Sequence, residues 1–339
     1  MKRKIFVALI LILAGFMSLY LREPEEFTRN SEAMNTIIRM TIYGHDDSPL
    51  DGAFSLLNEL DRRLSMYNPS SDISLINSNA GLHPVTVNSH TLKAVNDGMT
   101  LHEITGGVFN PLIGAVTKLW KINRADGKKP SPESLDHAVK LSDIRNLSVS
   151  GDKIFLRENG CVLDLGGIAK GYASAEIANH LKIRGVKSAI IDLGGNVQAL
   201  GEKPDGSAWR IGIRNPLKPF GTPAIVVDVK DCAVITSGNY ERYKTIDGKK
   251  YSHFFNPVTG ESVNSDLLSV TVITPDGSLA DGLATAFMIT GVDKALGILR
   301  EMDNPPGVVF ITQEGIIATS NLREVITKSL IPVIFAEVR

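Results

Sequence analysis

Residues 161–196 read CVLDLGGIAKGYASAEIANHLKIRGVKSAIIDLGGN, and the interpretation of the rest of the chain starts from this stretch. A short apolar run ends at Asp164, turns at Gly166-Gly167 and passes Lys170 into an amphipathic helix. A second apolar run then ends in the same four residues, Asp-Leu-Gly-Gly, at positions 192–195. Paired glycines after a strand let the backbone approach a ligand where a Cβ would clash.

The start of the helix adds an electrostatic feature to this turn. Its free N–H groups are offered to an anion, and Lys170 adds a positive charge there. Together these features predict a place that holds a phosphorylated small molecule. Two ordinary strand-to-turn junctions would give the same letters, so that alternative stays open for the segment alone. The pattern is neither Gly-x-Gly-x-x-Gly nor a Walker P-loop, so neither of those nucleotide-binding motifs is present here.

The bulk composition limits the class of protein. A chain of 339 residues with 43% apolar and 22% charged residues is globular and long enough for one large domain or two smaller ones. A net charge of −1, without a dense Lys/Arg stripe, gives no electrostatic case for nucleic acid binding. Two cysteines, Cys161 and Cys232, fit neither a disulfide framework nor a cysteine metal site, although a single disulfide between them stays open.

The N-terminus carries an export pattern. Lys2-Arg3-Lys4 precede an apolar run, residues 5–21, that contains no charged residue. This pattern predicts a signal, and the run is long enough to span a bilayer, so a cleaved peptide and an uncleaved anchor both stay open. Basic residues ahead of the run predict that the body lies outside the cytoplasm, on the periplasmic side and attached to the inner membrane. We therefore divide the chain into a signal or anchor with a polar tether, residues 1–30, and one domain, residues 31–339; the tether reading extends over residues 22–33.

Local patterns predict the secondary structure of that domain. Residues 65–74 are interpreted as a loop, and Asp247-Gly248 as a hairpin turn. Helices are expected near residues 49–64, 89–104, 171–185 and 279–289, and a short helix is expected to start at residues 131–133. Strands are expected near 36–43, 144–157, 209–213, 224–229, 232–236, 267–274, 308–312 and 316–319. Strands clustered in hairpins, with helices between them, predict an α+β fold of mostly antiparallel sheets with packed helices.

Two further segments hold residues that could perform chemistry. Asp281 and Thr285 are four residues apart, so both oxygens lie on one face of the expected late helix. A carboxylate with a hydroxyl suits Mg²⁺, whereas the alternative is an Asp that only stabilises the first turn of its own helix. His253 stands before an Asn-Pro turn, where it could take a proton from an incoming hydroxyl or serve a purely structural purpose.

Taken together, several blocks in this order resemble the FAD:protein FMN transferase family, or ApbE-like flavin transferases. The resemblance covers roughly residues 34–320. Its blocks are Met34-Asn35-Thr36, YNPSSDISLIN (67–77), GVFNPLIG (107–114) with Trp120, DLGGIAKGYA (164–173), IDLGGNVQALG (191–201), SGNYERY (237–243), HFFNPVTG (253–260) and ADGLATA (280–286). Each block alone is weak, but DLGGIAKGYA, H-x-x-N-P-x-T-G and A-D-x-x-A-T in this order are together highly specific.

The resemblance implies an ApbE/T-fold-like body and an extracytoplasmic activity. Such an enzyme cleaves FAD at its pyrophosphate, attaches FMN to a threonine (or serine) of a target protein, releases AMP and requires Mg²⁺. The acceptor would be a flavoprotein of an extracytoplasmic electron-transfer system. By the same resemblance Asp281, Thr285 and the Gly167 carbonyl would bind the metal, and His253 would be the base. The FAD site would contain Met34, Tyr67, Phe109, Asn110, Pro111, Asp164, Lys170 and Phe255.

The chain departs from the family pattern at three positions. Asn35 stands where the family usually has Gly, and Asn110 and Asn256 stand where it often has Asp. Two other functions of the same site stay open: an FAD pyrophosphatase that gives FMN and AMP, and a non-catalytic FAD-binding module. The sequence also leaves open the acceptor, cleavage of the N-terminal segment, the oligomeric state and whether residues 329–338 pack on the body.

Overall fold

The computed structural model describes residues 23–122, 124–219, 221–240 and 242–338, and it confirms the α+β fold. Its centre is a nine-stranded sheet in which successive neighbours are antiparallel, except for the last pair, which is parallel. In spatial order the sheet contains β1 (Glu25–Ala33), β2 (Thr36–Gly44), β6 (Ser188–Leu193), β7 (Asn196–Leu200), β10 (Ala233–Gly238), β13 (Leu267–Thr274), β14 (Gly307–Thr312), β15 (Ile316–Thr319) and β17 (Val333–Ala336).

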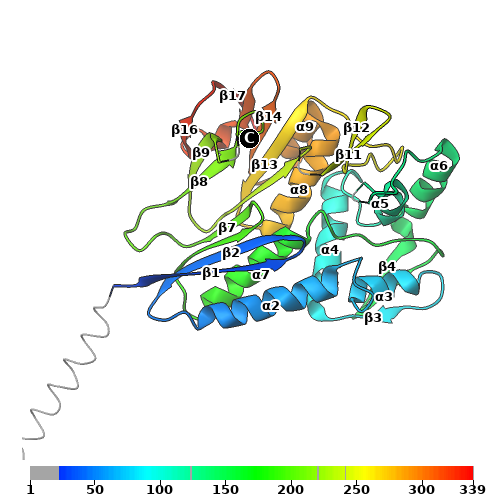
Figure 1. Ribbon diagram of the computed structural model, residues 1–339, viewed down its shortest axis with the longest axis horizontal. Helices are drawn as coiled ribbons and strands as arrows, with labels where there is room; N and C mark the ends of the chain where they lie inside the picture. The colour runs from blue at the N-terminus through cyan, green and yellow to red at the C-terminus, as the bar shows by residue number, and fades with distance from the viewer. Residues whose placement is uncertain (1–22, 123, 220, 241, 339) are drawn as a thin grey trace, which may run out of the picture.

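Helices cover one face of this sheet. They are α2 (Pro49–Leu64), α4 (Ser89–Ile104), α7 (Ala169–Ile183), α8 (Gly277–Thr290) and α9 (Val292–Glu301). In Figure 1, α2 and α7 lie along one side of the β1–β2 hairpin, and α8 lies against β13. Leu50, Leu57, Leu60 and Leu64 of α2 recur at helical spacing and are buried. They form part of the main apolar core between helices and sheet.

A second, three-stranded sheet covers part of the opposite face. It consists of β8 (Trp209–Arg214), β9 (Pro223–Val229) and β16 (Ile326–Ser329), and its apolar side chains pack on those of β10, β13 and β14. β17 extends the main sheet by pairing with β15. This pairing answers the open question about the C-terminal run: its strand packs on the body.

Short elements surround the end of the sheet at which β6 passes into β7. A third apolar cluster gathers there around Trp120. The elements are α3 (Asp72–Ser78), β3 (Val85–Thr86), α5 (Gly114–Trp120), α6 (Pro132–Leu141), η1 (Ile144–Asn146), β4 (Leu147–Ser150), β5 (Lys153–Leu156), β11 (Tyr243–Ile246) and β12 (Lys249–Ser252). The short helix η2 (Ser320–Leu322) lies elsewhere, against β14, and its Leu322 belongs to the second apolar cluster. The expected Asp247-Gly248 turn connects β11 and β12, with positive φ at both residues.

Three local expectations are wrong. The loop expected over residues 65–74 ends at Ser71, which caps the start of α3 at Asp72. The polar tether expected over residues 22–33 is a strand from Glu25 to Ala33, joined to β2 by a turn at Met34-Asn35. The strand was missed because only Ala33 is buried, so its period-two pattern is almost entirely polar. The apolar run before Asp164 is not a ladder strand either, since it forms only an isolated bridge between Val162 and Ile113.

The apolar run of the expected N-terminal signal or anchor, residues 5–21, lies outside the described residues, so the signal or anchor stays a prediction. Among the residues that the structure does describe, no helix is long and apolar enough to cross a membrane. Both cysteines are free thiols, which removes the disulfide that the sequence left open.

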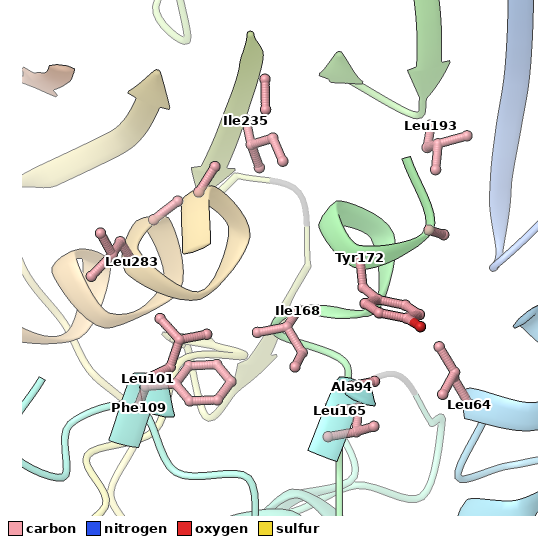
Figure 2. Packing of buried hydrophobic residues seen from close by; sticks show 14 of the residues in the cluster. Leu64, Ala94, Leu101, Phe109, Leu165, Ile168, Tyr172, Leu193, Ile235 and Leu283 are labelled. Carbon is pink, nitrogen blue, oxygen red and sulfur yellow. The ribbon is translucent and has the colours of Figure 1, made fainter. Parts of the chain in front are cut away.

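α7 and α8 approach each other closely where two glycines face one another. A Cβ on Gly171 would overlap the carbonyl oxygen of Gly277 and come within 2.6 Å of the Asp281 Cβ. Figure 2 shows Ile168 and Tyr172, at the start of α7, among buried side chains that include Ala94 of α4 and Leu283 of α8. The lack of a side chain at Gly171 therefore sets the distance between the two central helices.

Gly171→Ala should destabilise the fold. Because the new methyl group meets backbone rather than a flexible side chain, we expect a loss of about 1–3 kcal/mol in the free energy of unfolding. Urea denaturation followed by circular dichroism measures it. The matched control is Gly297→Ala in α9, where nothing lies within 4 Å of a built Cβ and helix propensity predicts a gain of about 0.5–1 kcal/mol. Equal stabilities of the two variants would contradict the prediction.

Candidate functional site

Asp281 is the most deeply buried carboxylate among the predicted site residues. It is 4% exposed, and its Oδ2 accepts a hydrogen bond from the Gly171 N–H at 2.9 Å. Its Oδ1 accepts from the Asn196 side-chain amide at 3.2 Å. Burial raises the pKa of Asp281, while the positive charge of Lys170 and these hydrogen bonds oppose that rise.

The alternative reading of Asp281, as a stabiliser of its own helix, does not hold. α8 is capped by Asp276, whose Oδ1 accepts from the Leu279 N–H at 3.0 Å. Asp281 instead receives an N–H from the first turn of α7, a helix that has no side-chain cap of its own. Its carboxylate therefore satisfies a backbone donor that the start of α7 would otherwise leave unpaired.

Thr285 and Gly167 meet one turn further along α8. The Thr285 hydroxyl donates to the Gly167 carbonyl oxygen at 3.4 Å. A Cβ on Gly167 would lie 2.9 Å from the Phe109 ring and 3.4 Å from the Thr285 side chain, so this position accepts only glycine without rearrangement. The first Asp-Leu-Gly-Gly segment thus brings a bare carbonyl to the α8 face that carries Thr285 and Asp281.

The predicted metal ligands fit a hard cation by their chemistry. Asp281, Thr285 and the Gly167 carbonyl supply a carboxylate, a hydroxyl and a carbonyl oxygen, and each retains lone pairs beyond its present hydrogen bonds. Within the described residues there is no group of three or more His, Cys, Asp or Glu side chains that could hold a metal ion. These three oxygen donors suit Mg²⁺ better than a metal that prefers thiolate or imidazole ligands. Mg²⁺ commonly binds one or two carboxylates and completes its coordination with waters and phosphates.

His253 is held in one tautomer by its neighbour. Its Nδ1 lies 2.9 Å from the Arg242 carbonyl oxygen, and because a carbonyl only accepts, Nδ1 carries the hydrogen. In the neutral ring Nε2 is then the free acceptor. Burial first, and then the charges of Arg242 and Lys170, lower the pKa of His253 to about 4, against the opposing hydrogen bond to Arg242. His253 is thus an unprotonated base at neutral pH.

Arg242 is a site residue that the sequence interpretation named only within the SGNYERY block. Its guanidinium lowers the pKa of Tyr67, Asp164 and His253, so it lies in electrostatic range of all three. Lys170 acts in the same way on Asp281 and His253. The predicted residues on which these two cations act come from four separate blocks, so the fold brings those blocks into one region.

Asp164 and Tyr67 face this region from different loops. The Asp164 carboxylate accepts from the Gly166 N–H at 2.9 Å, and burial raises its pKa against the pull of that bond and of nearby cations, including Arg242. Tyr67 is 66% exposed, so its ring is free to stack on a flat ligand. Partial burial and the Asp164 charge raise the pKa of Tyr67, while Arg242 lowers it.

The remaining predicted FAD contacts are placed less openly. Phe109 is buried beside Gly167, and the Pro111 carbonyl accepts from the Asp164 N–H at 2.8 Å. Phe255 is 5% exposed and stacks on Trp120, with ring centroids 5.9 Å apart. Their role as FAD contacts stays a prediction. In that prediction Phe255 would support the site from behind, as part of the apolar cluster around Trp120.

Met34 belongs to the β1–β2 turn, next to the second Asp-Leu-Gly-Gly segment. A Cβ on Gly194 would overlap the Thr36 side chain, so the two turns lie in contact. Asn196, at the end of that segment, then reaches Asp281. Met34 is half-buried at the rim of this group, and its own contact with FAD stays a prediction.

Each of the three departures from the family pattern has a local physical reason. Asn35 has φ of 59°, a left-handed conformation that Asn tolerates nearly as well as Gly. The Asn110 amide donates to the Ser142 carbonyl at 2.8 Å, a bond that an ionised Asp could not make. The Asn256 side-chain oxygen accepts from the Val258 and Thr259 N–H groups, and an Asp oxygen could accept the same two bonds.

Comparison with known proteins agrees with this arrangement. The model of the ApbE family matches residues 34–310, and the chain therefore belongs to the ApbE family. A protein of Treponema pallidum named FAD:protein FMN transferase is 34% identical over 303 residues, covering 84% of this chain and 83% of that protein. One of the same name from Klebsiella pneumoniae is 31% identical over 301 residues, covering 88% and 93%.

Solved structures share the fold as well. The flavin transferase ApbE of Vibrio cholerae superposes with a TM-score of 0.80 at 26% identity, over 89% of this chain and 99% of that one. The ApbE protein of Thermotoga maritima gives a TM-score of 0.82 at 25% identity, over 90% and 100%. The ApbE-like fold expected from the sequence is thus confirmed.

The His253 ring should titrate at about pH 4 in the folded protein, against an ordinary value of 6.5. Between these values the unfolded chain binds a proton that the folded chain does not, so His253 lowers stability as the pH falls through this range. NMR observation of the histidine Cε1–H shifts against pH measures the titration, with His253→Asn to assign the signal. A midpoint near 6.5 would contradict the burial argument.

Proposed function

We propose that this chain transfers FMN from FAD to a threonine (or serine) hydroxyl of a target protein and releases AMP. The main support is the meeting of hard oxygen ligands, a lysine and a neutral histidine at the turns of both Asp-Leu-Gly-Gly segments. Relatives that carry the name FAD:protein FMN transferase support the same reaction. Phosphoryl-group transfer needs this combination, because positioning and charge neutralisation dominate its catalysis.

In this proposal Asp281, Thr285 and the Gly167 carbonyl would hold Mg²⁺, which when bound would neutralise charge on the diphosphate oxygens. Lys170 adds a positive charge from the first turn of α7, where its ammonium also acts on Asp281. The N-terminus of α7 also favours a bound anion, because its unpaired backbone N–H groups point toward the ligand.

His253 would supply the base. Nε2 takes the proton of the acceptor hydroxyl as that oxygen forms a bond to the FMN phosphorus, and the diphosphate P–O bond breaks to release AMP. Nδ1 continues to donate its hydrogen bond to the Arg242 carbonyl, so the ring orientation does not change when Nε2 gains the proton. The low pKa keeps Nε2 free at neutral pH.

The FAD itself would contact residues from several loops. The exposed ring of Tyr67 would offer a flat surface to the flavin. Lys170 would lie toward the phosphates. The other proposed contacts are Met34, Phe109, Asn110, Pro111, Asp164 and Phe255. Asn110 contributes through the turn that it closes with the Leu112 N–H rather than through a charge.

The proposed setting is the periplasmic side of the inner membrane. Its support is the basic start of the chain and the uncharged apolar run over residues 5–21. The acceptor would be a flavoprotein of an electron-transfer system in the same compartment. A hydroxyl-bearing side chain of that protein then reaches FAD without crossing the membrane.

The deciding experiment incubates the full-length chain, purified in detergent, with FAD and a candidate acceptor domain, with Mg²⁺ or with EDTA. The intact mass of the acceptor is the readout. The expected result is an increase in the acceptor mass by one FMN in the sample with Mg²⁺ and no increase in the sample with EDTA. Release of free FMN and AMP without any gain, across several acceptors, would support the pyrophosphatase instead, and bound but uncleaved FAD the binding module.

Asp281→Ala should reduce Mg²⁺-dependent turnover by at least about 100-fold, because the metal would lose its carboxylate. The change also removes the acceptor of the Gly171 N–H, so the thermal midpoint should fall as well. Asp281→Asn is the matched control, since it keeps an oxygen for Gly171 without the charge. Comparable loss of turnover in both variants supports the metal role, whereas full activity of Asp281→Asn would contradict it.

A further inference from the structure

Asn196 stands at the start of β7, directly after the second Asp-Leu-Gly-Gly segment. Its side chain is 1% exposed, and Nδ2 donates to the Asp281 Oδ1 at 3.2 Å. The two residues are 85 positions apart in the chain. An amide this deeply buried is costly unless it is hydrogen-bonded, so the bond to Asp281 is a built contact rather than an incidental one.

The turn before Asn196 is fixed from two sides. The Asp192 Oδ1 accepts from the Gly195 N–H at 2.7 Å, inside the β6–β7 turn. Gly194, with φ of 68°, lies so close to Thr36 that a side chain at Gly194 would overlap it. Leu193 and Asn196 are paired across the turn, so the hairpin determines where the Asn196 amide points.

Asp281 is consequently held at both oxygens by different donors. The Gly171 N–H binds Oδ2, and the Asn196 amide binds Oδ1. One donor alone would leave the carboxylate free to rotate about its last bond. Two donors fix the plane of the carboxylate, and so they fix which lone pairs remain for a cation near Thr285 and the Gly167 carbonyl.

We propose that Asn196 is a positioning residue that orients the Asp281 carboxylate for binding of a divalent cation. This inference rests on the proposed function, which assigns the cation to Asp281. It gives the second Asp-Leu-Gly-Gly segment a purpose: the segment delivers a hydrogen-bond donor to the carboxylate, while the first delivers the Gly167 carbonyl.

The test is a titration of the full-length protein with Mn²⁺, followed by the electron paramagnetic resonance signal of the free ion. Asn196→Leu has nearly the same shape but no donor, so the Mn²⁺ Kd should rise roughly 10- to 100-fold, as for other partners of metal ligands. The FAD Kd measured in EDTA should stay unchanged. A purely structural role would lower the thermal midpoint and leave the Mn²⁺ Kd of the folded protein as it was.

Asn215→Leu is the matched control. Asn215 is buried to a similar degree, but its side-chain oxygen accepts from the Leu217 N–H, so its loss should not change the Mn²⁺ Kd. Asn196→Ala adds no atoms and serves if the leucine variant fails to fold. An unchanged Mn²⁺ Kd in a folded Asn196 variant, or an equal rise in the Asn215 control, would overturn the proposal.

This design separates the inference from the proposed function. Mn²⁺ binding is measured without FAD and without an acceptor. Suppose that the wild-type protein binds Mn²⁺, that Asn196→Leu weakens this binding, and that the wild-type protein transfers no FMN. This result would support the positioning role and contradict the transferase. A wild-type protein that binds no Mn²⁺ would overturn the positioning role.

Discussion

The buried Asp281 carboxylate is the interaction on which the centre of the structure depends. It joins α8 to the first turn of α7 through the Gly171 N–H and to the start of β7 through Asn196. The close contact of Gly171 with Gly277 makes this geometry available. A charged group in such a position is unfavourable unless several donors and a nearby cation compensate, and here two hydrogen bonds and Lys170 do so.

The two Asp-Leu-Gly-Gly segments share the same type of turn but bring different groups to the site. In each, the Asp side chain accepts from a glycine N–H within the turn, Gly166 in the first segment and Gly195 in the second. The first turn brings the Gly167 carbonyl to Thr285, and the second brings Asn196 to Asp281. Both therefore converge on one face of α8, although the second follows a ladder strand and the first does not.

Local signals predicted many of the elements, and long-range contacts account for part of what was missed, although the missed α9 has buried residues at helical spacing. α4 has the expected bounds because Asn88 caps its start and the chain turns at Gly106-Gly107 beyond its end. β1 was missed because its pattern is polar, and only pairing with β2 shows it to be a strand. The residue types at Asp281 and Thr285 suggested a metal site, but the partners of Asp281 lie 85 and 110 positions away, at distances that no local pattern encodes.

Burial and nearby charges together explain how the site can hold a neutral His253 close to the buried carboxylate of Asp281. Burial first, and then the charges of Arg242 and Lys170, lower the pKa of His253, while burial raises the pKa of Asp281 against the charge of Lys170. The same positive charge therefore keeps a base unprotonated and an acid closer to ionised. A bound divalent cation would act in the same direction on both groups. With such a cation bound, the site would favour an ionised Asp281 together with a neutral His253, which is the state that the proposed transfer to a hydroxyl requires.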